Sequence, residues 1–118
     1  MLKKQNRIQS NKEFQWIFKH SKPVFTGNLA MNASKSKDET MIKFGFVVSN
    51  KVEKRATRRN ALKRQLRSIA GGLISELKAG YDIVTVVKRD FPFPYNQEEI
   101  RKQFTEGMRR TGLLDAGK

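Results

Sequence analysis

The residues best suited to chemistry lie between positions 51 and 67, in the sequence KVEKRATRRNALKRQLR. This stretch holds eight lysines and arginines but one acidic residue, Glu53. A single carboxylate cannot neutralise the cations through ion pairs along a helix, and burial of unpaired charged groups is prohibitively costly. The run is either a basic face exposed to water or a surface that binds a polyanion, and its charge density favours the polyanion.

The spacing of apolar residues indicates how this surface is held in place. Residues 50–55 are expected to form a loop and residues 56–78 a helix. One side of that helix carries an apolar stripe, made of Leu62, Leu66, Ile69 and Leu73. The opposite side carries Asn60, Lys63, Arg64 and Arg67. The helix is therefore predicted to pack into the core with one face and to present charge on the other.

The composition agrees with a small nucleic-acid-binding domain. The 118 residues suit one domain, spanning 1–118, and the formal net charge of +14 makes nucleic acid the first partner to consider. The chain has no cysteine, which fits a reducing compartment, so the cytoplasm is the expected location. A membrane or DNA partner is not expected, because the basic helix lacks aromatic anchors and no helix-turn-helix pairing is evident.

Independent catalysis is not expected from these residues. His20 is the only histidine and lies between Lys19 and Lys22, as a solvated surface residue would. Without a second histidine or a cysteine, no metal site is predicted. Gly71-Gly72 falls within the predicted helix and lacks the lysine and hydroxyl residue of a phosphate-binding loop. No catalytic residue and no cofactor of the chain's own are therefore predicted.

A short helix is expected to precede the sheet. Residues 1–10 are polar and basic and are predicted to form a mobile arm. Ser10 or Asn11 can then cap a helix with Phe14, Ile17 and Phe18 on one face, while Trp16 points elsewhere. Phe14 and Phe18 are either core residues or a platform for unpaired bases.

The remaining elements complete an α+β domain. Strands are predicted at 24–33, 41–49 and 82–88, the last apolar on both faces. Gly45 has no side chain to cover its strand at that position. It is either the floor of a groove or a point where another backbone approaches closely. Asn96 is predicted to cap a final helix, and residues 112–118 to fray. The order is α-β-β-α-β-α, with one small sheet covered by helices.

Several segments resemble the bacterial ribonuclease P protein subunit. The chain has R-N-A-L-K-R-Q-L-R from Arg59, similar to the family signature, which is usually written R-N-R-x-x-K-R-x-x-R or a close variant, with Ala61 at the third position. EFQWIFKHSK, from Glu13, resembles the family's first helix. FGFVVSNK and GYDIVTVVKR resemble the strands before and after the basic helix, so the similarity extends over roughly residues 7–110.

The resemblance implies a mixed sheet with a left-handed strand-helix-strand crossover, like the second domain of a small-subunit ribosomal protein. It also implies a partner, the catalytic ribonuclease P RNA, which uses Mg²⁺ to remove the 5′ leader from precursor tRNA. The residues implied to face RNA are Lys51, Lys54, Arg55, Arg58, Arg59, Asn60, Lys63, Arg64 and Arg67. A cleft for the single-stranded leader is implied at Phe14, Phe18, Phe46 and Val48, and Asn32 stands where relatives often have an aromatic residue. The alternative is a general RNA-binding protein, either ribosome-associated or a chaperone.

Overall fold

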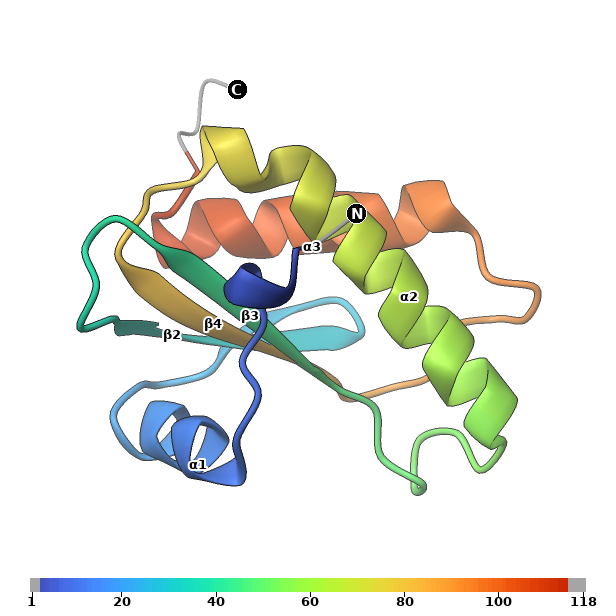
Figure 1. Ribbon diagram of the computed structural model, residues 1–118. Helices are drawn as coiled ribbons and strands as arrows, with labels where there is room; N and C mark the ends of the chain where they lie inside the picture. Colours follow the sequence, from blue (N-terminus) through green and yellow to red (C-terminus); the bar gives the residue numbers. More distant parts are fainter. Residues whose placement is uncertain (1–2, 115–118) are drawn as a thin grey trace.

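A mixed four-stranded sheet forms the centre of the protein, whose computed structural model describes residues 3–114 (Figure 1). The strands are β1 (Val24–Thr26), β2 (Leu29–Lys35), β3 (Ile42–Val47) and β4 (Tyr81–Val87). They lie in the order β1-β2-β4-β3. Both β1 and β4 run antiparallel to β2, whereas β3 runs parallel to β4. The predicted α+β class, with one mixed sheet, is confirmed.

Helices cover both faces of this sheet (Figure 1). On one face lies α1 (Asn11–Lys19), and on the other lie α2 (Ala56–Leu73) and α3 (Gln97–Thr111). Two short 3-10 turns complete the chain, η1 (Lys4–Asn6) and η2 (Ile74–Glu76). The basic helix α2 connects the parallel neighbours β3 and β4, as expected of a crossover. It ends five residues before the predicted position 78 because the chain tightens into η2.

The main core lies between the sheet and the two long helices. The predicted stripe of α2 supplies Leu62, Leu66 and Ile69, each fully buried. Replacing one of these with alanine is expected to cost about 2–5 kcal/mol. The strand β4 is apolar on both faces, as predicted, because Ile83 faces this core while Val84 joins Ile8 and Ile17 beneath α1. The basic face of α2 is thus held by packing on its opposite side.

The predicted strand 24–33 is wrong in one respect, since it is a hairpin of two strands. Thr26 pairs with Leu29, so Gly27 and Asn28 form a two-residue turn. Gly27 has a φ of 57°, a left-handed conformation that glycine adopts without strain. The Asn28 N–H donates to Gln103 Oε1 at 2.8 Å, which ties the turn to α3. The hairpin adds a strand to the predicted element order.

The predicted mobile arm is also wrong for the part that the structure describes. Asn6 is buried, and its Nδ2 donates to the Ile42 carbonyl at 2.8 Å. Ile8 is buried too, and its N–H donates to the Phe44 carbonyl at 2.9 Å. Residues 6–8 therefore lie along the outer edge of β3, held by long-range contacts.

The end of α3 is held as well, so the predicted fraying does not begin at residue 112. Gly112 closes the helix with a φ of 84°. Leu113 and Leu114 are then buried in the main core, and the Lys78 N–H donates to the Leu113 carbonyl at 3.0 Å. Residues 115–118 lie outside the described part of the chain.

Candidate nucleic-acid interface

The interface begins at the N-terminus of α2. Arg55 occupies the N-cap position but makes no side-chain capping hydrogen bond, and the first turn contains no acidic residue. The free backbone donors and the helix dipole at such an end favour an anion. Arg55 itself is exposed, as are Lys51, Lys54 and Asn60 around it. This end of the helix is therefore electropositive in both its backbone and its side chains.

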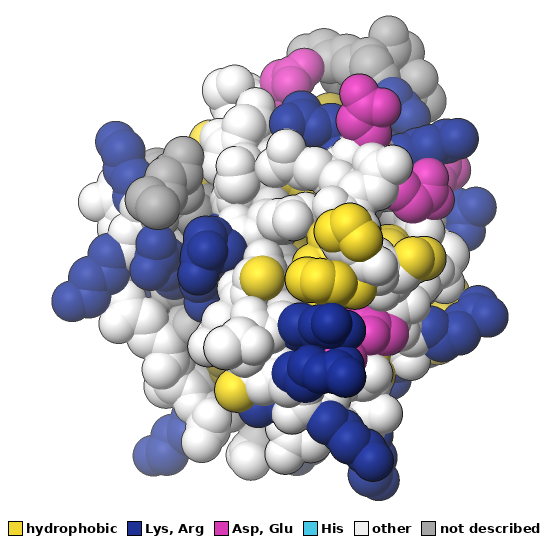
Figure 2. Space-filling view, turned by 90° about the vertical axis from the view of Figure 1, so that its right-hand side faces the viewer, with side chains coloured by type: hydrophobic (Ala, Val, Ile, Leu, Met, Phe, Trp, Pro, Cys, Tyr) yellow, Lys and Arg dark blue, Asp and Glu magenta, His cyan; other side chains and the backbone are white. Residues whose placement is uncertain are grey.

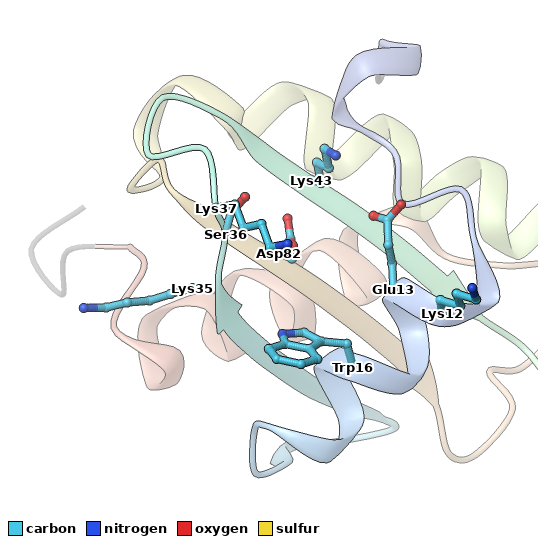
Figure 3. A pocket seen from close by; sticks show the side chains of 8 residues that line it. All are labelled: Lys12, Glu13, Trp16, Lys35, Ser36, Lys37, Lys43 and Asp82. Atoms are coloured by element: carbon cyan, nitrogen blue, oxygen red, sulfur yellow. The ribbon is translucent and has the colours of Figure 1, made fainter.

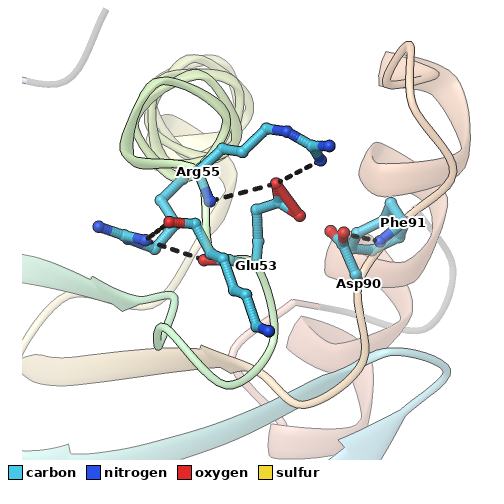
Figure 4. Close-up of polar contacts among 6 residues, drawn as sticks. Glu53, Arg55, Asp90 and Phe91 are labelled. Atoms are coloured by element: carbon cyan, nitrogen blue, oxygen red, sulfur yellow. Dashed lines mark hydrogen bonds and ion pairs between the residues drawn. The ribbon is translucent and has the colours of Figure 1, made fainter.

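Two of the predicted RNA-facing arginines also order the loop before α2 (Figure 4). Glu53 is buried, and its Oε1 accepts hydrogen bonds from the backbone N–H and the Nη1 of Arg55, both at 3.4 Å. Arg59 Nη1 donates to the carbonyls of Glu53 at 2.9 Å and Lys54 at 2.8 Å. These contacts hold Lys51 and Lys54 in a defined loop beside the helix end.

A carboxyl pair lies behind this loop. Burial raises the pKa of Glu53, but hydrogen bonds from Arg55 and Asp90 outweigh burial and bring the pKa below its ordinary value. Burial raises the pKa of Asp90, and the adjacent Glu53 carboxylate raises it further. The Phe91 N–H donates to Asp90 Oδ1 at 2.9 Å (Figure 4). Glu53 is therefore the ionised member, and Asp90 retains its proton to a higher pH than an ordinary aspartate.

Arg58 lies on a different face from the aromatic residues of α1. Its guanidinium carbon is 3.9 Å from the ring centroid of Phe93, which packs edge-on against Tyr95 at 5.3 Å. Figure 2 shows hydrophobic side chains beside a row of basic ones on the side of the molecule where α2 begins. The family signature has an arginine where this chain has Ala61, and the neighbouring Arg58 could have been expected to compensate for it. Because the Arg58 guanidinium packs on the Phe93 ring, its placement does not support that role.

One groove brings together all four predicted leader-binding residues and one cation of α2. Its volume is about 410 Å³, and its lining includes Phe14, Phe18, Phe46, Val48 and Lys63. Phe18 is 42% exposed, whereas Val48 is 6% exposed and belongs mainly to the core. A Cβ on Gly45 would lie 2.5 Å from Phe14 Cε1, so Gly45 is a point of close approach beneath the Phe14 ring. Phe18 and Lys63 are the accessible aromatic and basic groups here.

The groove continues toward the basic face of α2. A neighbouring hollow shares Phe14 and Phe46 with it and adds Arg7 and Arg67 to the lining. A third hollow shares those two arginines. The side chains that line it are Arg7, Arg64, Gln65, Arg67, Ser68 and Gln97, none of them acidic. Burial lowers the pKa of Arg67, and the charges of Arg7 and Arg64 lower it further. Such crowding of cations favours a bound polyanion.

The outcome for the predicted residues is therefore mixed. Lys63, Arg64 and Arg67 lie along one continuous surface with Phe14 and Phe18. Asn32, at the position where relatives often have an aromatic, is buried and donates to Ser21 Oγ at 3.1 Å, which ties β2 to the end of α1. Sequence reasoning missed Arg7 as a groove residue. The apolar Ile8, alone within the polar stretch 3–12 and buried in the structure, is the signal that could have indicated a docked segment.

The described residues also lack two other kinds of feature. Within residues 3–114, no helix has the length and apolar character needed to cross a bilayer. In the same part of the chain, no three histidine, aspartate or glutamate side chains are grouped as a metal site would require.

Comparisons with known proteins agree on one family. The Ribonuclease P family model matches residues 2–112. A ribonuclease P protein component from Synechocystis is 30% identical over 116 residues, covering 98% of this chain and 93% of that protein. A ribonuclease P protein component from Oceanobacillus iheyensis is 33% identical over 113 residues, covering 96% of this chain and 92% of that protein.

Solved structures show the same fold. The Staphylococcus aureus RNase P protein superposes with a TM-score of 0.80 at 22% identity, covering 93% of this chain and 98% of that one. The Thermotoga maritima RNase P protein superposes with a TM-score of 0.74 at 24% identity, covering 88% of this chain and 96% of that one. On the family match and these relatives, the chain belongs to the ribonuclease P protein family.

Proposed function

We propose that this chain is the protein subunit of a bacterial ribonuclease P and assists the endonucleolytic removal of the 5′ leader from precursor tRNA in the cytoplasm. The observation that carries the proposal is the continuous groove, which places aromatic and cationic side chains next to the basic face of α2. One surface can thus contact two RNA segments at once, a single strand and a structured RNA.

The leader binds in the part of the groove nearest α1. A single-stranded leader offers unstacked bases and phosphates, which aromatic rings and cations recognise together. Phe18 supplies an exposed ring from α1, and Lys63 supplies a charge from α2. Phe14 is half-buried over Gly45, so it supports the groove and also offers part of its ring. The leader path therefore runs between α1 and α2.

The catalytic RNA binds at α2 and the hollow beyond the leader path. Arginine contacts phosphate through a planar fork of donors, and Arg64, Arg67 and Arg7 converge on one hollow. The uncapped helix N-terminus adds backbone donors for a second phosphate. The RNA subunit and its Mg²⁺ ions carry out hydrolysis, and this chain contributes binding and positioning.

Leader removal at low Mg²⁺ tests the function directly. The chain is added to a bacterial ribonuclease P RNA and precursor tRNA, and release of the leader is followed over time. We expect faster release than with a basic protein of equal charge and size. Equal stimulation by that control would instead indicate a general RNA-binding protein. Binding of precursor tRNA and of mature tRNA, measured side by side on the assembled complex, then isolates the contribution of the leader.

A further inference from the structure

A second pocket lies at the other side of α1 and shares no lining residue with the groove (Figure 3). Its volume is about 340 Å³, within the range of small-ligand sites. Side chains from α1, from the end of β2 and its following turn, from β3 and from β4 line it. They are Lys12, Glu13, Trp16, Lys35, Ser36, Lys37, Lys43 and Asp82.

Trp16 is the main apolar feature of this pocket. It is 56% exposed, although the His20 ring stacks on it with centroids 3.7 Å apart and an interplanar angle of 23°. His20 is in turn held by its Nδ1, 2.9 Å from the Trp16 carbonyl. One face of the indole is therefore covered by the His20 ring. The exposed part of the indole can still stack with a planar ligand. Figure 3 shows it extending from α1 toward the end of β2.

The polar side chains of the pocket complement a nucleotide. Four lysines against two carboxylates make the pocket cationic, which suits phosphate. Lys43 pairs in register with Asp82 across β3 and β4, so both residues share a row at one end of the sheet. Asp82 is half-buried and lines the pocket, where Lys43 and Ser36 lie close to its carboxyl group. The Asp82 carboxyl group thus offers hydrogen-bond acceptors in the same pocket as the Trp16 ring and the lysines.

We propose that this pocket binds one unpaired nucleotide of single-stranded RNA, with the base stacked on Trp16 and the phosphates held by Lys12, Lys35 and Lys37. The Asp82 carboxylate accepts from the amino group of adenine, cytosine or guanine. Uracil has no amino group, and its single edge donor is flanked by carbonyl oxygens that repel a carboxylate. The pocket therefore discriminates against uracil, and this property goes beyond the function proposed above.

Fluorescence of Trp16 tests the pocket directly, because Trp16 is the only tryptophan of the chain. The full chain is titrated with hexamers of adenylate, of cytidylate and of uridylate at fixed ionic strength. We expect quenching by adenylate and cytidylate that weakens as salt rises. The uridylate hexamer should bind about tenfold more weakly, the factor expected for one hydrogen bond to a charged group. Equal quenching by all three would overturn the role of Asp82.

Variants locate the binding site and separate it from general charge effects. Lys35→Gln should weaken quenching by every hexamer. Asp82→Asn should reduce the difference in affinity between the uridylate hexamer and the other two hexamers. Lys102→Gln is the matched control, because it removes the same charge from an exposed position on α3 outside the pocket. Equal losses in Lys35→Gln and Lys102→Gln, or equal quenching by a polyglutamate peptide, would overturn the proposal. Since no ribonuclease P RNA is present, the result does not depend on the function proposed above.

Discussion

Phe14 occupies the space that any side chain at position 45 would need, since a Cβ on Gly45 would lie 2.5 Å from Phe14 Cε1 and 3.3 Å from Ile8 Cδ1. This contact seats α1 and the N-terminal segment on the sheet together. It also sets the height of the Phe14 ring within the groove, so the glycine determines the shape of the proposed leader site.

Gly45→Ala is therefore expected to destabilise the fold and deform the groove. The added methyl group must displace Phe14, and overpacking of this kind costs about 1–3 kcal/mol. Chemical denaturation measures the loss. Gly72→Ala is the matched control, because nothing lies within 4 Å of a Cβ at that position of α2. In that helix, alanine should stabilise by about 0.5–1 kcal/mol. Equal stabilities for wild type and Gly45→Ala would show that Phe14 moves freely.

Phe18→Ala should weaken leader binding while leaving stability nearly unchanged. Phe18 is 42% exposed and lines the same groove as Lys63, so the lost interaction is with RNA rather than with the core. The expected loss is about 1–3 kcal/mol for precursor tRNA and close to none for mature tRNA. Phe25→Ala removes a comparably exposed ring, at 58%, from β1 and serves as the control. Equal losses on both tRNAs would place Phe18 outside the leader path.

Arg64→Gln should lower the salt dependence of RNA binding without unfolding the chain. Arg64 is exposed and lines the hollow that also contains Arg7 and Arg67. One lost phosphate contact should reduce the slope of log affinity against log salt by about 0.7–0.9. Titrations of ribonuclease P RNA at several salt concentrations measure this slope. Arg101→Gln, at an exposed position on α3, controls for net charge and should keep the slope closer to that of wild type.

Asp90→Asn should stabilise the protein at about pH 8 and have little effect at about pH 4. The pKa of Asp90 is raised in the folded state, so its protonated form supports the fold and that support is lost as pH rises through the folded pKa. Asparagine supplies a permanent donor toward Glu53. Thermal unfolding at the two pH values measures the effect.

Asp38→Asn provides a control with the opposite sign. Hydrogen bonds from Thr40 lower the pKa of Asp38, so its carboxylate stabilises the fold above its unfolded pKa. This replacement should destabilise the protein at about pH 8. A loss of stability in Asp90→Asn at the same pH would show that the proton is not shared with Glu53.

The elements that could be predicted from the sequence are those specified by local periodicity. The stripe of Leu62, Leu66 and Ile69 predicts α2 because each residue repeats a burial requirement three or four positions later. The hairpin at Gly27 was missed because the alternation after the turn continues the pattern of a strand. A two-residue interruption leaves little trace in such a pattern.

In the candidate site, too, residues specified by local spacing could be predicted, and residues placed by long-range contacts could not. Lys63, Arg64 and Arg67 share a helical face, so their common direction follows from spacing. Arg7 joins them because the neighbouring Asn6 bonds to Ile42, a partner 36 residues away. No local pattern encodes that distance. Arg59 likewise has the sequence context of an RNA-binding residue, yet it also bonds to backbone carbonyls of its own loop.

The segment that runs along β3 has a further consequence, for solubility. A sheet edge with unpaired backbone groups can pair with another chain and aggregate. At the far edge, β1 is only three residues long. At the near edge, the bond from Ile8 to Phe44 covers part of β3 with the protein's own backbone. Removing the residues before Ser10 would therefore expose a hydrophobic strand, and a truncated chain should self-associate even though α1, α2 and α3 keep all of their residues.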